Sequence, residues 1–143
     1  MTGLELFKSL TVKEAATVLI HWYYLNDINP IEDILEEHDC EDDWAKGLRE
    51  PFVKFLNNTS QAGGSISNWH ILRTLNAVNL AHKICVLFFI FDELGKEVVE
   101  DIHLSEDTED YHCVDAYFGC TKDTTYCIEN LILSIFRENC EEA

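Results

Sequence analysis

The sequence contains many side chains that could bind a metal or move a proton, among them 6 His, 6 Cys and 27 Asp or Glu. Two pairs have Glu-x-x-His spacing, Glu100 with His103 and Glu109 with His112. In di-iron helical bundles such pairs direct a carboxylate and an imidazole from two different helices toward the metal. Here the pairs are nine residues apart and no apolar helical period accompanies them. We therefore expect solvated acidic segments at both places.

The adjacent residues His38 and Asp39 form the kind of pair that metal-dependent phosphohydrolases use as ligands, and His21 is a candidate further ligand. His21 is expected on the polar side of its helix, together with Thr17. The segment that follows the pair is acidic, whereas a buried metal site requires an apolar helix. A strongly negative protein also repels phosphorylated substrates. A metal-dependent hydrolase or oxidase is therefore the alternative function rather than the leading one.

Three cysteines, Cys113, Cys120 and Cys127, follow one another at intervals of seven residues. Zinc sites usually use two close pairs separated by about two to four residues, and this chain has none. Cys40 and Cys140 stand among acidic residues, a setting that disfavours the thiolate. We expect six reduced thiols, because 143 residues can bury a sufficient core without disulfides.

Motifs for nucleotide binding and for serine hydrolysis are missing from the sequence. Gly63 and Gly64 are not followed by the Lys and Ser or Thr of a phosphate-binding loop, and no Gly-x-Ser-x-Gly occurs. His82 shares the expected helical face of Leu75 and Val78, which predicts a hydrogen-bonded core histidine. We therefore predict no catalytic residue, no bound cofactor and no metal.

The strongest signal in the sequence is its net charge of −17. Residues 1–50 hold 12 acids and 4 bases, residues 92–143 hold 15 acids and 3 bases, and residues 51–91 hold no acid. Solubility of a small domain requires a net charge of only about 2–8. Nucleic-acid phosphates favour Lys and Arg, so direct binding to nucleic acid is opposed. The charge predicts a partner with a cationic surface.

Two acidic clusters could form that contact. The first cluster, residues 32–43, has eight acids and no base, and the second, residues 97–110, has seven acids and no base. Aromatic residues beside the clusters could provide the anchors that interfaces favour. The predicted partner-binding residues are Glu36, Glu37, Asp39, Glu41, Asp42, Asp43 and Trp44 in the first region, and Glu106, Asp107, Glu109, Asp110 and Tyr111 in the second.

Helical periods run through most of the chain and would position these residues. Capping boxes at Thr2 and Thr11 predict two N-terminal helices, the second ending near Leu25. Pro30 begins a helix to about residue 38, and Pro51 is expected to divide the next period into two short helices. Residues 57–65 are expected to form a loop.

The second half of the chain continues this pattern. Ser67 or Asn68 is expected to cap a helix whose period reaches Leu94, with a possible bend. Within it Ile84–Phe91 is apolar on all sides, which fits a buried helix better than a buried strand. Residues 99–124 are expected to be irregular, and a last helix should begin near residue 123. The fold class is all-α, an irregular bundle of five to seven helices around the acid-free centre.

Length and composition agree with one domain over residues 1–143, with 47% hydrophobic residues available for a core. No secretory signal is recognisable, and the longest apolar run falls short of the roughly 20 residues of a membrane span. We expect a cytoplasmic binding protein, not an enzyme and not a membrane protein. The leading function is inhibition of a basic protein, as an immunity protein or a nucleic-acid mimic. A structural adaptor is a further alternative, and the oligomeric state stays open.

Overall fold

The computed structural model describes residues 1–25, 28–37, 43–59, 66–102, 104 and 128–139. Within these residues the chain forms eight helices and no strand, so the all-α prediction is confirmed and the helix count exceeds the expected five to seven. The helices are α1 (Gly3–Ser9), α2 (Val12–Leu25), α3 (Ile31–Glu37), α4 (Asp43–Asn57), α5 (Asn68–Arg73), α6 (Ala77–Leu94), α7 (Lys96–Asp101) and α9 (Ile128–Arg137).

Both predicted capping boxes are present at the N-terminus. The Thr2 amide donates to Glu5 Oε1 at 3.2 Å, and the Glu5 amide donates to Thr2 Oγ1 at 3.2 Å. The same reciprocal pair joins Thr11 and Glu14, at 2.9 and 3.2 Å. Hydrogen bonds from the amide and then the hydroxyl of Thr2 lower the pKa of Glu5 below its ordinary value of 4.5.

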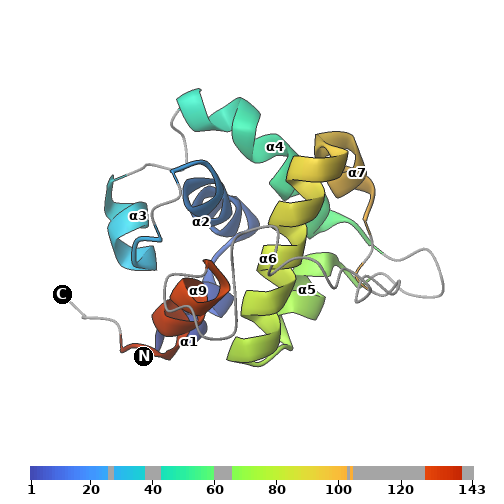
Figure 1. Cartoon of the computed structure of the whole chain (residues 1–143). Helices are drawn as coiled ribbons and strands as arrows, with labels where there is room; N and C mark the ends of the chain where they lie inside the picture. The colour runs from blue at the N-terminus through green and yellow to red at the C-terminus, as the bar shows by residue number, and fades with distance from the viewer. Residues whose placement is uncertain (26–27, 38–42, 60–65, 103, 105–127, 140–143) are drawn as a thin grey trace.

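The buried helix α6 occupies the centre of the molecule. It packs against α9 on one side and α7 on another, while α2 packs against α4 (Figure 1). Ile84–Phe91 is helical, as predicted, and Ile84 and Phe88 are fully enclosed. One cluster of buried side chains joins α6 to the other helices. In it the Phe7 ring stacks on Trp22, and the Phe136 ring lies tilted against Phe7. The acid-free segment therefore supplies half of the buried hydrophobic residues.

The expected division at Pro51 is wrong, because α4 runs unbroken through it. Proline in a helix removes one hydrogen bond, here to the Gly47 carbonyl, and costs about 3 kcal/mol. Burial of Phe52, Phe55 and Leu56 on the next turn offsets that cost, since full burial of each large apolar side chain contributes about 1.5–3 kcal/mol. Tertiary packing therefore overrides the local preference.

The period from residue 68 to residue 94 is divided into two helices. Ser67 caps α5 by accepting from the His70 amide at 3.1 Å, and Asn76 caps α6 by accepting from the Asn79 amide at 2.9 Å. The prediction that residues 99–124 are irregular is wrong at its start, since α7 reaches Asp101, and residues 105–127 lie outside the described part.

Asn68 lies in the interior, where its side chain joins three segments. Its amide nitrogen donates to the Phe55 carbonyl at 2.8 Å and to the Ile102 carbonyl at 2.7 Å, and its oxygen accepts from the Leu104 amide at 3.0 Å. Asn58 adds a second hydrogen bond to the Ile102 carbonyl at 3.0 Å. The two amides thereby attach the chain after α7 to α4 and α5.

The last helix closes the bundle against the N-terminus. The Gly3 amide donates to the Glu138 carbonyl at 2.8 Å, and α1 packs along α9 (Figure 1). Ile132 and Phe136 are buried, whereas the predicted start near residue 123 lies outside the described residues. Gly3 is required at this contact because an added Cβ would collide with the Ile135 carbonyl oxygen.

Candidate functional site

The first predicted acidic cluster lies at the junction between α3 and α4. Glu36 is exposed on the last turn of α3, and Glu37 is the last residue of that helix. Asp43 and Trp44 begin α4. The remaining predicted contact residues, Asp39, Glu41 and Asp42, lie outside the described part of the chain, as do His38 and Cys40.

The second predicted cluster is described only at its start, on α7. Glu97 and Asp101 are exposed there, and Glu100 lies 3.9 Å from Lys54 of α4. The predicted contact residues themselves, Glu106, Asp107, Glu109, Asp110 and Tyr111, lie outside the described residues.

Every Asp and Glu side chain whose burial the structure describes is at least partly accessible. Among the described residues, Lys54 lies 3.9 Å from Glu100, and His82 Nδ1 lies 2.9 Å from Glu129 Oε1. The accessible surface of 8031 Å² corresponds to one net negative charge per about 470 Å². The negative charge of these described residues is therefore carried on the surface.

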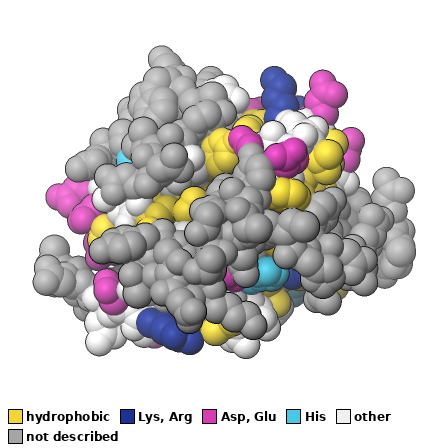
Figure 2. Space-filling model, viewed as in Figure 1, with side chains coloured by type: hydrophobic (Ala, Val, Ile, Leu, Met, Phe, Trp, Pro, Cys, Tyr) yellow, Lys and Arg dark blue, Asp and Glu magenta, His cyan; other side chains and the backbone are white. Residues whose placement is uncertain are grey.

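A surface that the sequence patterns did not reveal lies where α6 meets α7, and we call residues 92–101 the α6–α7 corner. Leu94, predicted to extend the buried face of α6, is 51% exposed, and Val98 is 40% exposed. The reason is that α6 ends at Leu94. The next residue, Gly95, has a φ of 92° and turns the chain into α7. Figure 2 shows hydrophobic side chains flanked by acidic ones over the region of α7 and the end of α4.

Packing beneath the corner holds it in place. The Tyr23 hydroxyl of α2 donates to Asp92 Oδ1 at 2.9 Å. The Tyr23 ring meets the Phe91 ring edge-on at 4.9 Å, and the Phe52 ring stacks on Phe91 at 5.2 Å. Val99 of α7 is fully buried against the core. The exposed corner is thus held by aromatic packing and a hydrogen bond from the residues beneath it.

The polar side of α2, where His21 and Thr17 are expected, is buried. His21 and Arg49 are each only 4% exposed, and α4 packs against α2. His21 Nε2 lies 3.3 Å from the side-chain Nδ2 of Asn29, and Arg49 of α4 donates to the Thr17 hydroxyl at 3.1 Å. The polar residues of α2 therefore help to join two helices, and they belong to the interior.

The placement of His82 in the core is also wrong. Its side chain is 41% exposed, and Nδ1 lies 2.9 Å from Glu129 Oε1, across the contact between α6 and α9. His82 is hydrogen-bonded, as expected, but at the edge of the helix pair. Val78, one turn earlier on the predicted buried face, is 49% exposed.

Metal-binding patterns receive no support from the part of the chain that is described. Its residues contain no group of three or more His, Cys, Asp or Glu placed to hold a metal. Cys85 is buried and forms no disulfide, whereas the other five cysteines lie outside the described residues. His103 and the pair Glu109 and His112 also lie outside them.

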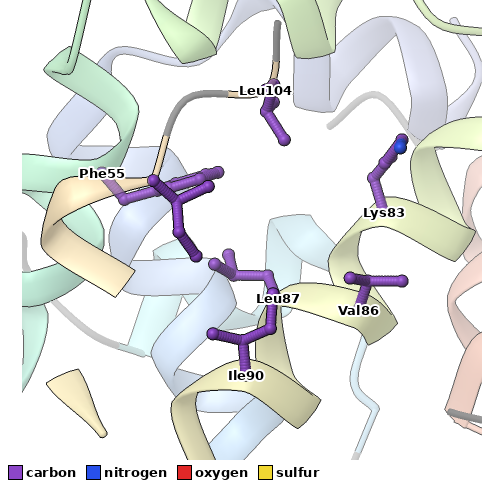
Figure 3. Close-up of a pocket in the computed structure, with 7 residues that line it drawn as sticks. Phe55, Lys83, Val86, Leu87, Ile90 and Leu104 are labelled. Carbon is purple, nitrogen blue, oxygen red and sulfur yellow. The ribbon is translucent and has the colours of Figure 1, made fainter. Parts of the chain in front are cut away.

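A shallow apolar hollow lies between α4, α6 and the segment after α7. Its volume of about 230 Å³ includes its open mouth. Figure 3 shows Phe55, Leu87, Ile90 and Leu104 around it and Lys83 on the side opposite Phe55. Small-molecule sites usually enclose about 300–1,000 Å³ and carry convergent polar groups, which this hollow lacks.

Comparisons with known proteins do not place the chain in a family. No protein-family model, no curated protein and no solved structure matches it. None of the helices described here combines the length and the apolar character that a membrane span requires.

Proposed function

We propose that this chain is a small acidic cytoplasmic protein that binds and inhibits a basic protein by covering the partner's cationic surface. The proposal requires no catalytic activity and no cofactor. The observation that carries it is the accessibility of every carboxylate whose burial the structure describes. Carboxylates that are not neutralised within the molecule remain available to the Lys and Arg of a partner.

The physical advantage of such a surface lies in association. A concentrated field of one sign increases the rate of encounter with an oppositely charged surface by about 10- to 1,000-fold at low salt. Like charges at one per about 470 Å² also repel one another, which lowers the stability of the folded state. A contact with a basic partner relieves that repulsion. The loss of repulsion then contributes favourably to the free energy of binding.

Two forms of the function share this chemistry. In one form the chain is an immunity protein for a cationic nuclease toxin. In the other it is a nucleic-acid mimic that occupies the site of a DNA-binding protein. In both, the chain displaces nucleic acid from its partner, so a displacement assay tests what the two have in common.

The metal-dependent enzyme and the structural adaptor are the competing functions. Stoichiometric metal in the purified protein would favour the enzyme. The adaptor requires an extensive apolar patch on the acid-free segment. The described residues of that segment supply half of the buried hydrophobic residues and expose few large apolar side chains, such as Ile66 and Val78. The acidic surface is therefore the better-supported site.

Association kinetics provide the decisive test, after the partner has been captured at low salt and identified by mass spectrometry. Amide substitutions in the first cluster, at Glu36, Glu37, Asp39, Glu41, Asp42 and Asp43, should lower the association rate about tenfold at low salt and leave dissociation nearly unchanged. The paired set in the second cluster replaces Glu106, Asp107, Glu109 and Asp110. We expect the effect to shrink as salt increases, because screening shortens the range of the field.

The matched control removes acids outside both clusters. Glu50 of α4 and Glu138 after α9 are exposed, so Glu50→Gln with Glu138→Gln tests the loss of charge alone. Unchanged association for both cluster sets at low salt would show that the proposed function is wrong.

A further inference from the structure

We infer that the α6–α7 corner is the docking surface for a cationic amphipathic helix of the basic partner. Leu94 and Val98 form its apolar centre, and the surrounding carboxylates form its rim. This inference rests on the function proposed above and identifies where, and by what kind of segment, the partner is held.

The apolar centre is the first observation. Leu94 and Val98 are two of the few large apolar side chains that the described residues expose, and they stand four positions apart on either side of Gly95. Val78 and Ile66, with similar exposure, stand instead in the acid-free segment. Interfaces combine an apolar centre with a polar rim. Leu94 and Val98 have acidic neighbours in the sequence that could form such a rim, whereas Val78 and Ile66 do not.

Charge complementarity identifies the occupant. Asp92, Glu93, Glu97 and Asp101 are all exposed and flank Leu94 and Val98 along the chain, and Lys96 is the only base in residues 92–101. A partner segment that satisfies this arrangement has Leu-like residues for the centre and Lys or Arg on both sides of them. The described residues offer no strand edge for a peptide to extend, so an amphipathic helix is the fitting form.

The corner is ordered before anything binds. The hydrogen bond from Tyr23 to Asp92, the aromatic contacts of Phe91 and the burial of Val99 fix both helices at the turn. A surface already held in its binding geometry loses less conformational entropy on association. These contacts therefore keep the side chains of Leu94 and Val98 accessible at the surface.

Two synthetic peptides provide the test with the full chain. The first has Leu at helical spacing and Lys at the other positions, and the second keeps each Lys and replaces each Leu with Ser. We expect the Leu/Lys peptide to bind more tightly at low salt and to shift the amide resonances of residues 92–101 in a ¹⁵N-labelled sample. Shifts centred elsewhere would overturn the inference.

Variants separate the apolar centre from the charge. Leu94→Ser with Val98→Ser should raise the Kd of the Leu/Lys peptide about tenfold, because two partly buried aliphatic contacts are lost. The matched control Val78→Ser removes an apolar side chain of equal exposure far along α6, and it should change the Kd less than twofold. Glu93→Gln with Glu97→Gln should weaken both peptides more than Glu50→Gln with Glu138→Gln does.

The outcomes distinguish the inference from the proposed function. Equal binding of both peptides, unaffected by the corner substitutions, would refute the docking surface and leave the acidic-surface function standing. If neither cationic peptide binds at low salt, both are refuted. Circular dichroism of each variant should match the parent chain, since every substituted side chain is exposed.

Discussion

Single residues of the same type have opposite roles in this chain, depending on their surroundings. Gly3 touches the backbone of α9, with no room for a Cβ, whereas Gly47 lies exposed in α4 with nothing within 4 Å of an added Cβ. Glycine costs a helix about 1 kcal/mol relative to alanine, so Gly47 weakens α4 without an evident packing reason. Gly3, by contrast, permits the closest approach between α1 and α9.

We therefore predict opposite effects for two alanine substitutions. Gly3→Ala should lower the free energy of unfolding by about 1–3 kcal/mol, because the Ile135 carbonyl must move to admit the methyl group. Gly47→Ala should raise it by about 0.5–1 kcal/mol through helix propensity. Urea unfolding monitored by circular dichroism measures both. A neutral Gly3→Ala would mean that α1 does not pack on α9 in this way.

His21 and His82 show what a helical sequence pattern does not predict about a single side chain. A helical period identifies an apolar face, and Ala15, Ala16 and Leu19 of that face in α2 are buried. The period gives no information about what covers the polar face, and His21 on that face is also buried. The prediction for His82 is wrong in the opposite sense. Its side chain was predicted to be in the core, but it is 41% exposed and contacts Glu129 of α9.

At the scale of elements, local sequence signals predicted where most helices begin. They did not predict helix continuity or turns that depend on tertiary contacts. Capping at Thr2, Thr11 and Ser67 follows from side chains within three residues, so sequence suffices. The continuity of α4 through Pro51 depends on distant packing partners. The turn at Gly95 is visible as a glycine, but its geometry depends on how α7 packs on α4 and α6. For that reason the α6–α7 corner was not predicted.

The junction between α4, α5 and α7 depends on Asn68, which gives a second prediction. Asn68→Ala should lower the free energy of unfolding by about 2–4 kcal/mol, because it leaves the Phe55 and Ile102 carbonyls and the Leu104 amide without this buried partner. Asn68→Asp keeps the acceptor for Leu104 and loses the donors. Hydrogen exchange of residues 96–104 should quicken in both variants.

The control for this junction is Asn57→Ala, at an exposed position at the end of α4. It should change stability by less than about 0.5 kcal/mol, as surface substitutions usually do. An equal loss in both variants would mean that the Asn68 amide contributes nothing specific to the attachment of α7.

At the scale of the whole molecule, composition predicted where charged and apolar residues lie relative to the surface. The charge of −17 and the acid-free segment 51–91 were enough to expect a buried centre and a negative surface, and the described residues agree with both. Most contact residues expected in the two clusters lie outside the described part, so those positions stay predictions. The corner depends instead on two helices meeting, which composition does not reveal.

Salt should stabilise the free protein, and this is the prediction that belongs to the charge as a whole. The carboxylates whose burial is described are accessible, so their mutual repulsion acts through solvent, where ions screen it over about 30 Å at 0.01 M and about 10 Å at 0.1 M. Raising sodium chloride across that range should raise the Tm by a few degrees, since about 1 kcal/mol shifts the Tm of a domain of this size by roughly 3–5 °C. The neutralised first-cluster variant should start from a higher Tm and gain less from salt, because part of the repulsion is already removed. A Tm that stays flat or falls with salt would mean that the acids are paired within the molecule, and a surface neutralised in that way could not attract a basic partner.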